Sequence, residues 1–150
     1  MADRTDGPRE ATVLQGGRRK AYRPLPPEAR RAALADGLAA CDRGDWFLAH
    51  ELLEPAWMGT DDLPERELYQ GLIKVAAAHV HRIRGNAVGM RKNLVGARAL
   101  LRAAVDGDAD PAGLDLRGLL AAVDDRLDRL VRLVSPDARS VPPIRIPRLS

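Results

Sequence analysis

Apolar residues recur every three or four positions along most of the chain, which is the spacing of one buried helix face. Gly44, Gly59 and Gly85 each follow one of these segments and are typical helix stops. The pattern therefore predicts an all-α fold, a single five-helix bundle without any strand. The predicted helices cover residues 27–42, 46–58, 64–84, 86–105 and 112–134.

Polar residues that favour helix starts precede four of the predicted helices. Asp45, Asp62, Asn86 and Asp110 are the expected N-cap positions. In the second helix, Pro55 lacks a backbone N–H and predicts a kink or an early end.

The third predicted helix is expected to be the central element of the bundle. From Leu72 to Val80 it is apolar on most sides, apart from Lys74 and His79. Such a sequence is typical of a helix that other helices surround.

Both ends of the chain lack the helical periodicity. Residues 1–26 are polar and basic and are predicted to be a flexible arm, while residues 27–134 form the bundle. Residues 135–150 contain four prolines, which disfavour the α conformation in the residues before them, so an extended tail is predicted. Two roles for this tail are open: it lies in a groove of the bundle, or it recognises a partner.

The net charge of +3 resides in the two ends of the 150-residue chain. Residues 1–26 carry six basic and three acidic side chains, residues 135–150 carry three and one, and the bundle is therefore at −2. This distribution argues against nucleic acid as a partner, because a nucleic-acid-binding domain has a basic folded surface. No apolar run is long enough to span a membrane, and the single cysteine, Cys41, favours a reducing, cytoplasmic setting.

Polar side chains occur on two helices where apolar faces should meet. On the second helix, His50 and Glu54 are one turn apart, and Glu51 is next to them. On the third helix, Gln70 and His81 are three turns apart and point in the same direction. We therefore expect these five residues to form a polar cluster between the two helices.

Three motifs in this region carry a resemblance to a known family. They are Trp46-Phe47-x-Ala49-His50-Glu51-x-Leu53-Glu54-x-x-Trp57, Gln70-Gly71-Leu72-Ile73 and His81-x-x-x-Gly85-Asn86-x-x-Gly89. In this order and spacing, residues 40–100 resemble the domain-of-unknown-function 309 family. The resemblance implies a small all-helical bundle with no established activity, and its characteristic polar residues fall on the five cluster positions. Pro55 and Lys74 depart from the family pattern.

Three interpretations of the polar cluster are open. In the structural interpretation, the buried polar groups pair with one another and fix the register of the two helices. In the metal interpretation, His50, Glu54 and His81 bind a divalent ion such as zinc, with Glu51 as a general base for hydrolysis. In the binding interpretation, the cluster recognises a small polar ligand or a peptide in a groove walled by a tryptophan.

Whether the chain is an enzyme stays open on the sequence alone. The zincin motif requires histidine where Glu54 stands, and Cys41, with no histidine near it in sequence, is interpreted as a buried apolar residue. The expected partner is another protein or a second copy of the chain. Four arginines in and before the fourth helix form a second candidate site, for anions: Arg84, Arg91, Arg98 and Arg102.

Overall fold

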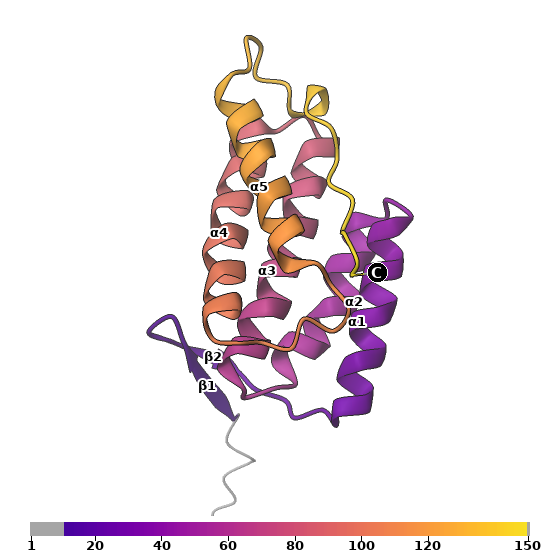
Figure 1. The fold of residues 1–150 in the computed structure, drawn as a ribbon, viewed down its shortest axis with the longest axis vertical. Coiled ribbons are helices and arrows are strands. Elements are labelled where there is room, and N and C mark those ends of the chain that lie inside the picture. Colours follow the sequence, from indigo (N-terminus) through magenta and orange to yellow (C-terminus); the bar gives the residue numbers. More distant parts are fainter. Residues whose placement is uncertain (1–10, 150) are drawn as a thin grey trace, which may run out of the picture.

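The computed structural model describes residues 11–149, which contain five α-helices, a two-stranded hairpin and one short 3-10 helix (Figure 1). The predicted all-α, five-helix class is confirmed. The helices are α1 (Pro27–Asp42), α2 (Trp46–Met58), α3 (Leu63–Ile83), α4 (Ala87–Asp106) and α5 (Leu116–Val131). The strands β1 (Thr12–Gln15) and β2 (Arg18–Ala21) precede α1, and η1 (Ala138–Ser140) follows α5.

Three of the predicted helix starts are confirmed. The side chains of Asp45, Asp62 and Asn86 each accept a hydrogen bond from the backbone N–H three positions later. Each bond satisfies one of the donors that a helix start leaves free.

The last helix is shorter than predicted at both ends. α5 begins after the cap Asp115 and not after Asp110, because Ala112 and Gly113 have φ angles of 51° and 81°. These left-handed conformations are excluded from a right-handed helix. The helix ends at Val131 and not at residue 134.

Pro55 lies inside α2 without ending it, so the predicted range 46–58 is confirmed and, of the kink or early end expected at Pro55, the early end does not occur. The neighbouring side chains of Leu53 and Ala56 are fully buried in the core. Their burial holds the turn in place although one backbone hydrogen bond is missing. α2 therefore continues to Met58.

α3 is the central helix, as predicted, because it packs against both α2 and α4. Its ten buried residues run from Arg66 to His79. Fully buried leucines from the neighbouring helices, such as Leu53, Leu94 and Leu101, complete the core. None of the helices within residues 11–149 combines the length and the apolar content that crossing a membrane requires.

Residues 12–21, in the predicted flexible arm, form an antiparallel hairpin, so the prediction that no strand forms is wrong. Thr12 lies opposite Ala21 and Gln15 opposite Arg18. The turn is made by Gly16 and Gly17, whose φ angles of 59° and 76° are accessible to glycine. Residues 1–10 of the predicted arm lie outside the described part of the chain.

The proline-containing tail is extended, as predicted, and lies on its own bundle. It runs from η1 past α5 to the side of α2 (Figure 1). Val141, Ile144 and Ile146 are buried against the helices. Arg82 of α3 and Arg126 of α5 donate hydrogen bonds to carbonyl oxygens of the tail.

His79 fastens the middle of this tail to α3. Its fully buried ring stacks on Trp46 with 3.8 Å between centroids. Nδ1 donates to the Val75 carbonyl at 2.8 Å, and Nε2 accepts the N–H of Ile144 at 2.8 Å. These bonds require the neutral imidazole, and burial lowers the pKa of His79 to about 4.

This geometry predicts that the free energy of unfolding falls as the pH is lowered from about 6.5 to 4. In that window the unfolded chain binds a proton at His79 that the folded chain excludes. The free energy of unfolding therefore falls by about 3 kcal/mol over the whole range. Urea unfolding of the wild type and His79→Phe at several pH values measures the difference. The phenylalanine variant should lose this part of the pH dependence, whereas His50→Gln should retain it. Equal pH dependence in the wild type and His79→Phe would contradict the prediction.

Candidate functional site

The five residues of the predicted polar cluster all lie in the described part of the chain, and none hydrogen-bonds to another. Gln70 accepts a hydrogen bond from the side-chain amide of Gln15 in the hairpin at 2.6 Å. The Nδ1 atom of His81 lies 3.1 Å from the amide nitrogen of Asn86 at the start of α4. The two polar residues of α3 therefore have partners outside α2.

The polar residues of α2 face a different part of the molecule. Glu51 and Glu54 line an open cavity of about 640 Å³ together with residues 23–25. His50 does not line this cavity and is half-buried. Two of the three predicted cluster residues of α2 thus share a surface, which the sequence placed on the α3 side.

The predicted metal ligands do not make up a metal-binding group. Within residues 11–149, no group of three or more histidine, cysteine, aspartate or glutamate side chains is arranged to hold a metal ion. The reason is visible in the partners: His81 contacts the start of α4, whereas Glu54 faces residues 23–25.

The four arginines of the predicted anion site are not brought together as one group either. Arg98 and Arg102 both approach Asp124 of α5, at 3.4 and 3.7 Å. Arg91 lines a shallow groove with Arg98, and Arg84 is the exposed C-cap residue of α3.

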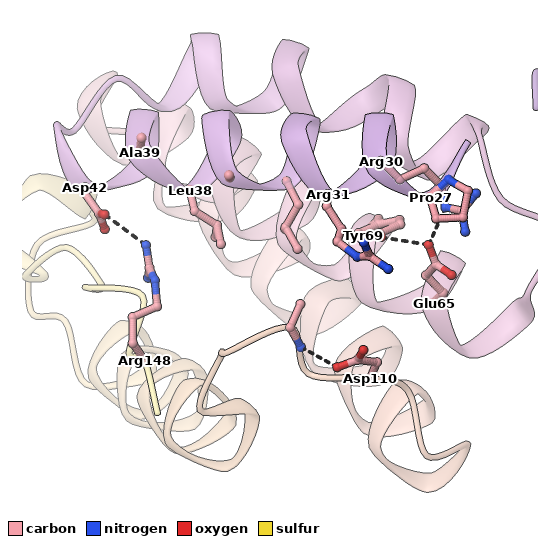
Figure 2. A pocket seen from close by; sticks show the side chains of 13 residues that line it. Pro27, Arg30, Arg31, Leu38, Ala39, Asp42, Glu65, Tyr69, Asp110 and Arg148 are labelled. Atoms are coloured by element: carbon pink, nitrogen blue, oxygen red, sulfur yellow. Dashed lines mark hydrogen bonds and ion pairs between the residues drawn. The ribbon is translucent and has the colours of Figure 1, made fainter. Parts of the chain in front are cut away.

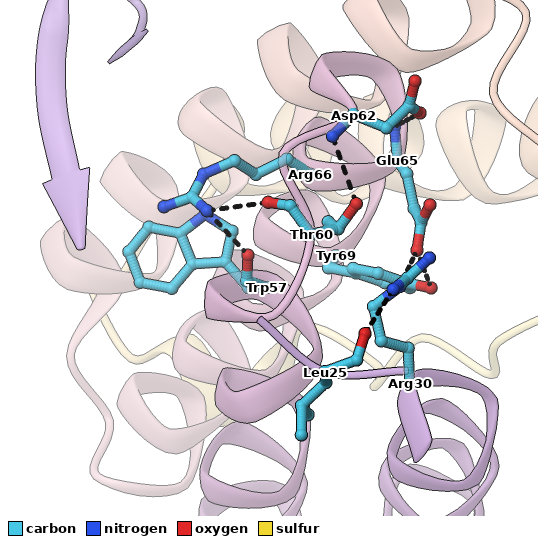
Figure 3. Close-up of polar contacts among 8 residues, drawn as sticks. All are labelled: Leu25, Arg30, Trp57, Thr60, Asp62, Glu65, Arg66 and Tyr69. Carbon is cyan, nitrogen blue, oxygen red and sulfur yellow. Dashed lines mark hydrogen bonds and ion pairs between the residues drawn. The ribbon is translucent and has the colours of Figure 1, made fainter. Parts of the chain in front are cut away.

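The most buried charged group among the described residues is Arg66, which the sequence analysis did not single out. Its side chain is 0% exposed, and all of its hydrogen bonds go to neutral oxygens. Figure 3 shows the two bonds to Trp57 and Thr60. Nη1 donates to the carbonyls of Trp57 and Thr60 at 3.0 Å, and Nη2 to that of Ala21 at 2.8 Å. Nε donates to the side chain of Gln15 at 3.0 Å.

Arg66 lies where the C-terminal end of α2 leaves carbonyl oxygens without partners in the helix. The carbonyls of Trp57 and Thr60 accept from its guanidinium, and those of Met58 and Gly59 accept the N–H groups of residues 23 and 25. The negative end of the helix dipole also favours a cation at this position. Every carbonyl from residue 57 to residue 60 is thereby paired.

The buried charge of Arg66 is stabilised because protein groups provide the interactions that water provides to an exposed guanidinium. Burial lowers the pKa of Arg66. Four hydrogen bonds and the face of the Trp57 indole, 5.1 Å from the guanidinium carbon, offset the loss of hydration. The sequence did contain a signal, since Arg66 precedes the buried Tyr69 and Ile73 at helical spacing and so occupies the buried face of α3.

A groove with a volume of about 590 Å³ runs along α1 (Figure 2). Its apolar wall includes Leu34, Leu38 and Tyr69. The opposite wall is formed by the loop before α5, through Asp110 and Ala112.

One end of this groove is held by a hydrogen-bonded set of three side chains. Arg30 forms an ion pair with Glu65 at 2.6 Å, and the Tyr69 hydroxyl donates to the same carboxylate oxygen at 2.8 Å (Figure 3). Arg30 also donates to the Leu25 carbonyl. Burial raises the pKa of Tyr69, and the hydrogen bond to Glu65 raises it further. The hydroxyl is therefore protonated and a donor at neutral pH.

The other end of the groove is closed by the tail, through an ion pair of 2.9 Å between Arg148 and Asp42 (Figure 2). Between the two ends, Arg31 is exposed and forms no ion pair within residues 11–149. Asp110, on the opposite wall, likewise forms no ion pair within these residues. The groove therefore combines an apolar wall with one cation and one anion that are available to a ligand.

Cys41 occupies the end of α1 as a buried thiol. Burial, and then the nearby Asp42 carboxylate, raise the pKa of Cys41 to about 12. The thiol is consequently protonated at neutral pH, which agrees with its interpretation as a buried apolar residue.

Comparison with known families covers the segment from α1 to the start of α4. Residues 34–93 match the family model of a domain of unknown function, DUF309. The resemblance predicted from the three motifs is confirmed. A comparison with curated proteins found no match.

The structure gives a physical reason for the last of the three motifs in the DUF309-like segment. The Oδ1 atom of Asn86 caps α4 by accepting the Gly89 N–H at 2.9 Å, while its amide group contacts His81. A Cβ atom at Gly89 would lie 2.4 Å from Nδ1 of His81. The imidazole therefore packs directly on the backbone at the first turn of α4, and only glycine leaves room for it.

We predict that Gly89→Ala and Gly96→Ala have opposite effects on stability, although both lie in α4. The first substitution forces His81 from its position and should cost about 1–3 kcal/mol. At Gly96 the added Cβ would meet Lys74 at an ordinary 3.6 Å, so alanine should stabilise the helix by about 0.5–1 kcal/mol. Thermal unfolding of both variants tests this, and a stabilising Gly89→Ala would contradict the packing argument.

Proposed function

We propose that this chain is a peptide-binding module and that its ligand occupies the groove along α1. The ligand is an extended peptide segment with apolar side chains and at least one acidic side chain. The apolar residues would pack on Leu34, Leu38 and Tyr69, and the acidic one would pair with Arg31. The ligand is thus a peptide, as in the binding interpretation of the sequence, but its site lies along α1 and not at the polar cluster.

The observation that carries the proposal is the charge distribution of the groove. Arg30 and Arg148 are already paired with Glu65 and Asp42 of the same chain. Arg31, between them, forms no such pair within the described residues. Asp110 on the opposite wall also forms no ion pair within the described residues. A carboxylate on the ligand would pair with Arg31, and a donor group beside it would face Asp110.

The size and rigidity of the groove support the same proposal. Its volume of about 590 Å³ falls in the usual range for sites that enclose small molecules or a few peptide residues. The contacts of Arg30 with Glu65 and of Arg148 with Asp42 fix both ends. Little conformational entropy would then be lost on binding, which favours affinity.

The polar residues that the sequence analysis selected fit a structural role instead. Gln70 binds the hairpin through Gln15, and His81 supports the start of α4 through Asn86. Both side chains are therefore occupied in connecting elements of the fold, which is the structural interpretation applied to two of the five cluster residues.

The proposal predicts a specific outcome of peptide selection. A phage-displayed random peptide library is selected on the full chain, and each selected peptide is measured by isothermal titration calorimetry. The selected sequences should share an acidic residue flanked by apolar ones. Ala35→Trp, which fills the groove, and Arg31→Glu, which reverses its free charge, should each weaken binding at least about tenfold.

Ala32→Trp provides the matched control, because Ala32 is exposed on the same helix but does not line the groove. This variant should bind the selected peptides like the wild type. Peptides that bind Ala35→Trp as tightly as the wild type, or a selection that yields no binding peptide, would contradict the proposal.

A further inference from the structure

Helices α4 and α5 share an outer face with exposed apolar side chains. Val88 is 80% exposed, Val95 39% and Val131 73%. Val95 and Val131 line the same shallow groove, of about 390 Å³, although they belong to different helices. Exposed apolar side chains that adjoin one another are a usual mark of an interaction surface.

Charged side chains of opposite sign border this groove on its two helices. α4 contributes Arg91 and Arg98, and α5 contributes Asp124 and Asp128. One side of the face is thus basic and the other acidic. We name this surface the α4–α5 face, and its residues are Arg91, Val95, Arg98, Asp124, Asp128 and Val131.

The ion pair between Arg98 and Asp124, at 3.4 Å, shows that these two residues lie at about the same height on the two helices. α4 and α5 run in opposite directions (Figure 1). Counting from Arg98 and Asp124, Arg91 is level with Val131 and about 4.5 Å from the level of Asp128. Arg98 and Asp124 therefore match in height, and the long side chain of Arg91 can span its height difference of about 4.5 Å from Asp128.

We propose that the α4–α5 face binds the same face of a second copy of this chain, around a two-fold axis parallel to the two helices. Rotation about such an axis places α4 of one copy against α5 of the other at unchanged height. Arg91 then meets Asp128 of the second copy, and Arg98 meets its Asp124. The valines of both copies lie between these charges, and the four helices form one bundle.

Charge complementarity selects a second copy as the occupant of this face. A two-fold interface must be complementary to itself, and a face with basic residues on one helix and acidic residues on the other meets that condition. Within one chain the pairs are long or incomplete: Arg98 and Arg102 lie 3.4 and 3.7 Å from Asp124, and Asp128 lies 3.4 Å from the exposed Arg132. Arg91 has no ion pair within residues 11–149. The second copy would supply closer partners.

The dimer would leave the proposed ligand groove open. α1 lies on the opposite side of the bundle from α4 (Figure 1). The two inferences are therefore independent, and each can fail without the other.

Charge reversal combined with mixing tests the proposed pairing. The molar mass of the full chain is measured by light scattering after gel filtration over a wide concentration range. The wild type should be a dimer, while Arg91→Glu and Asp128→Arg should each reduce dimer affinity at least about tenfold through like-charge contacts. An equimolar mixture of the two variants should regain the dimer, because each mutant side chain then meets its opposite charge.

The matched control reverses two exposed charges outside the α4–α5 face, Arg18→Glu and Asp36→Arg, which should leave the dimer intact. Circular dichroism melting checks that all four variants fold. A wild type that is monomeric at every concentration would overturn the proposal. A dimer insensitive to both Arg91→Glu and Asp128→Arg, or a mixture that fails to regain it, would also overturn the proposed arrangement.

Discussion

The interaction on which this fold most depends is the pairing of the buried Arg66 guanidinium with carbonyl oxygens at the C-terminal end of α2. The last carbonyls of a helix need donors, and a buried cation needs acceptors. Each group therefore offsets the desolvation free energy of the other. The acceptors belong to the hairpin, to α2 and to the turn after it. A two-stranded hairpin has little stability by itself in water, and here Gln15 and Ala21 attach it to the bundle through this arginine.

The C-terminal tail covers part of the bundle and completes the α1 groove. His79 and Arg82 hold the tail on one side, and the tail then delivers Arg148 to the end of the α1 groove. Only part of the groove lies in the DUF309-like segment, namely its lining residues between Leu34 and Asp42 of α1 and two residues of α3. Four charged residues of the groove lie outside that segment: Arg30, Arg31, Asp110 and Arg148. If the proposed function is correct, charged residues outside the matched segment determine which ligand the groove binds.

Hydrophobic periodicity and cap residues predicted five helices and the central position of α3, because these features follow from local spacing and from burial. The hairpin was missed because its strands are four residues long and mostly polar, so their stability comes from distant contacts such as Gln15 with Gln70. The expected contact among the five cluster residues does not form, for a related reason. Helical angles place His50 and His81 on a face but do not reveal which neighbour each will meet, and Asn86 is the partner of His81.

Native-state hydrogen exchange at the junction between the hairpin and α1 tests the central role of this pairing most directly. The amides of Arg23 and Leu25 donate to the carbonyls of Met58 and Gly59, beside the oxygens that Arg66 occupies. If the hairpin and the α2 end form one structural unit, these amides should exchange with the same opening free energy as the core amides of α2 and α3. Exchange of both amides at the rate of an unstructured peptide, while α3 stays protected, would contradict the account.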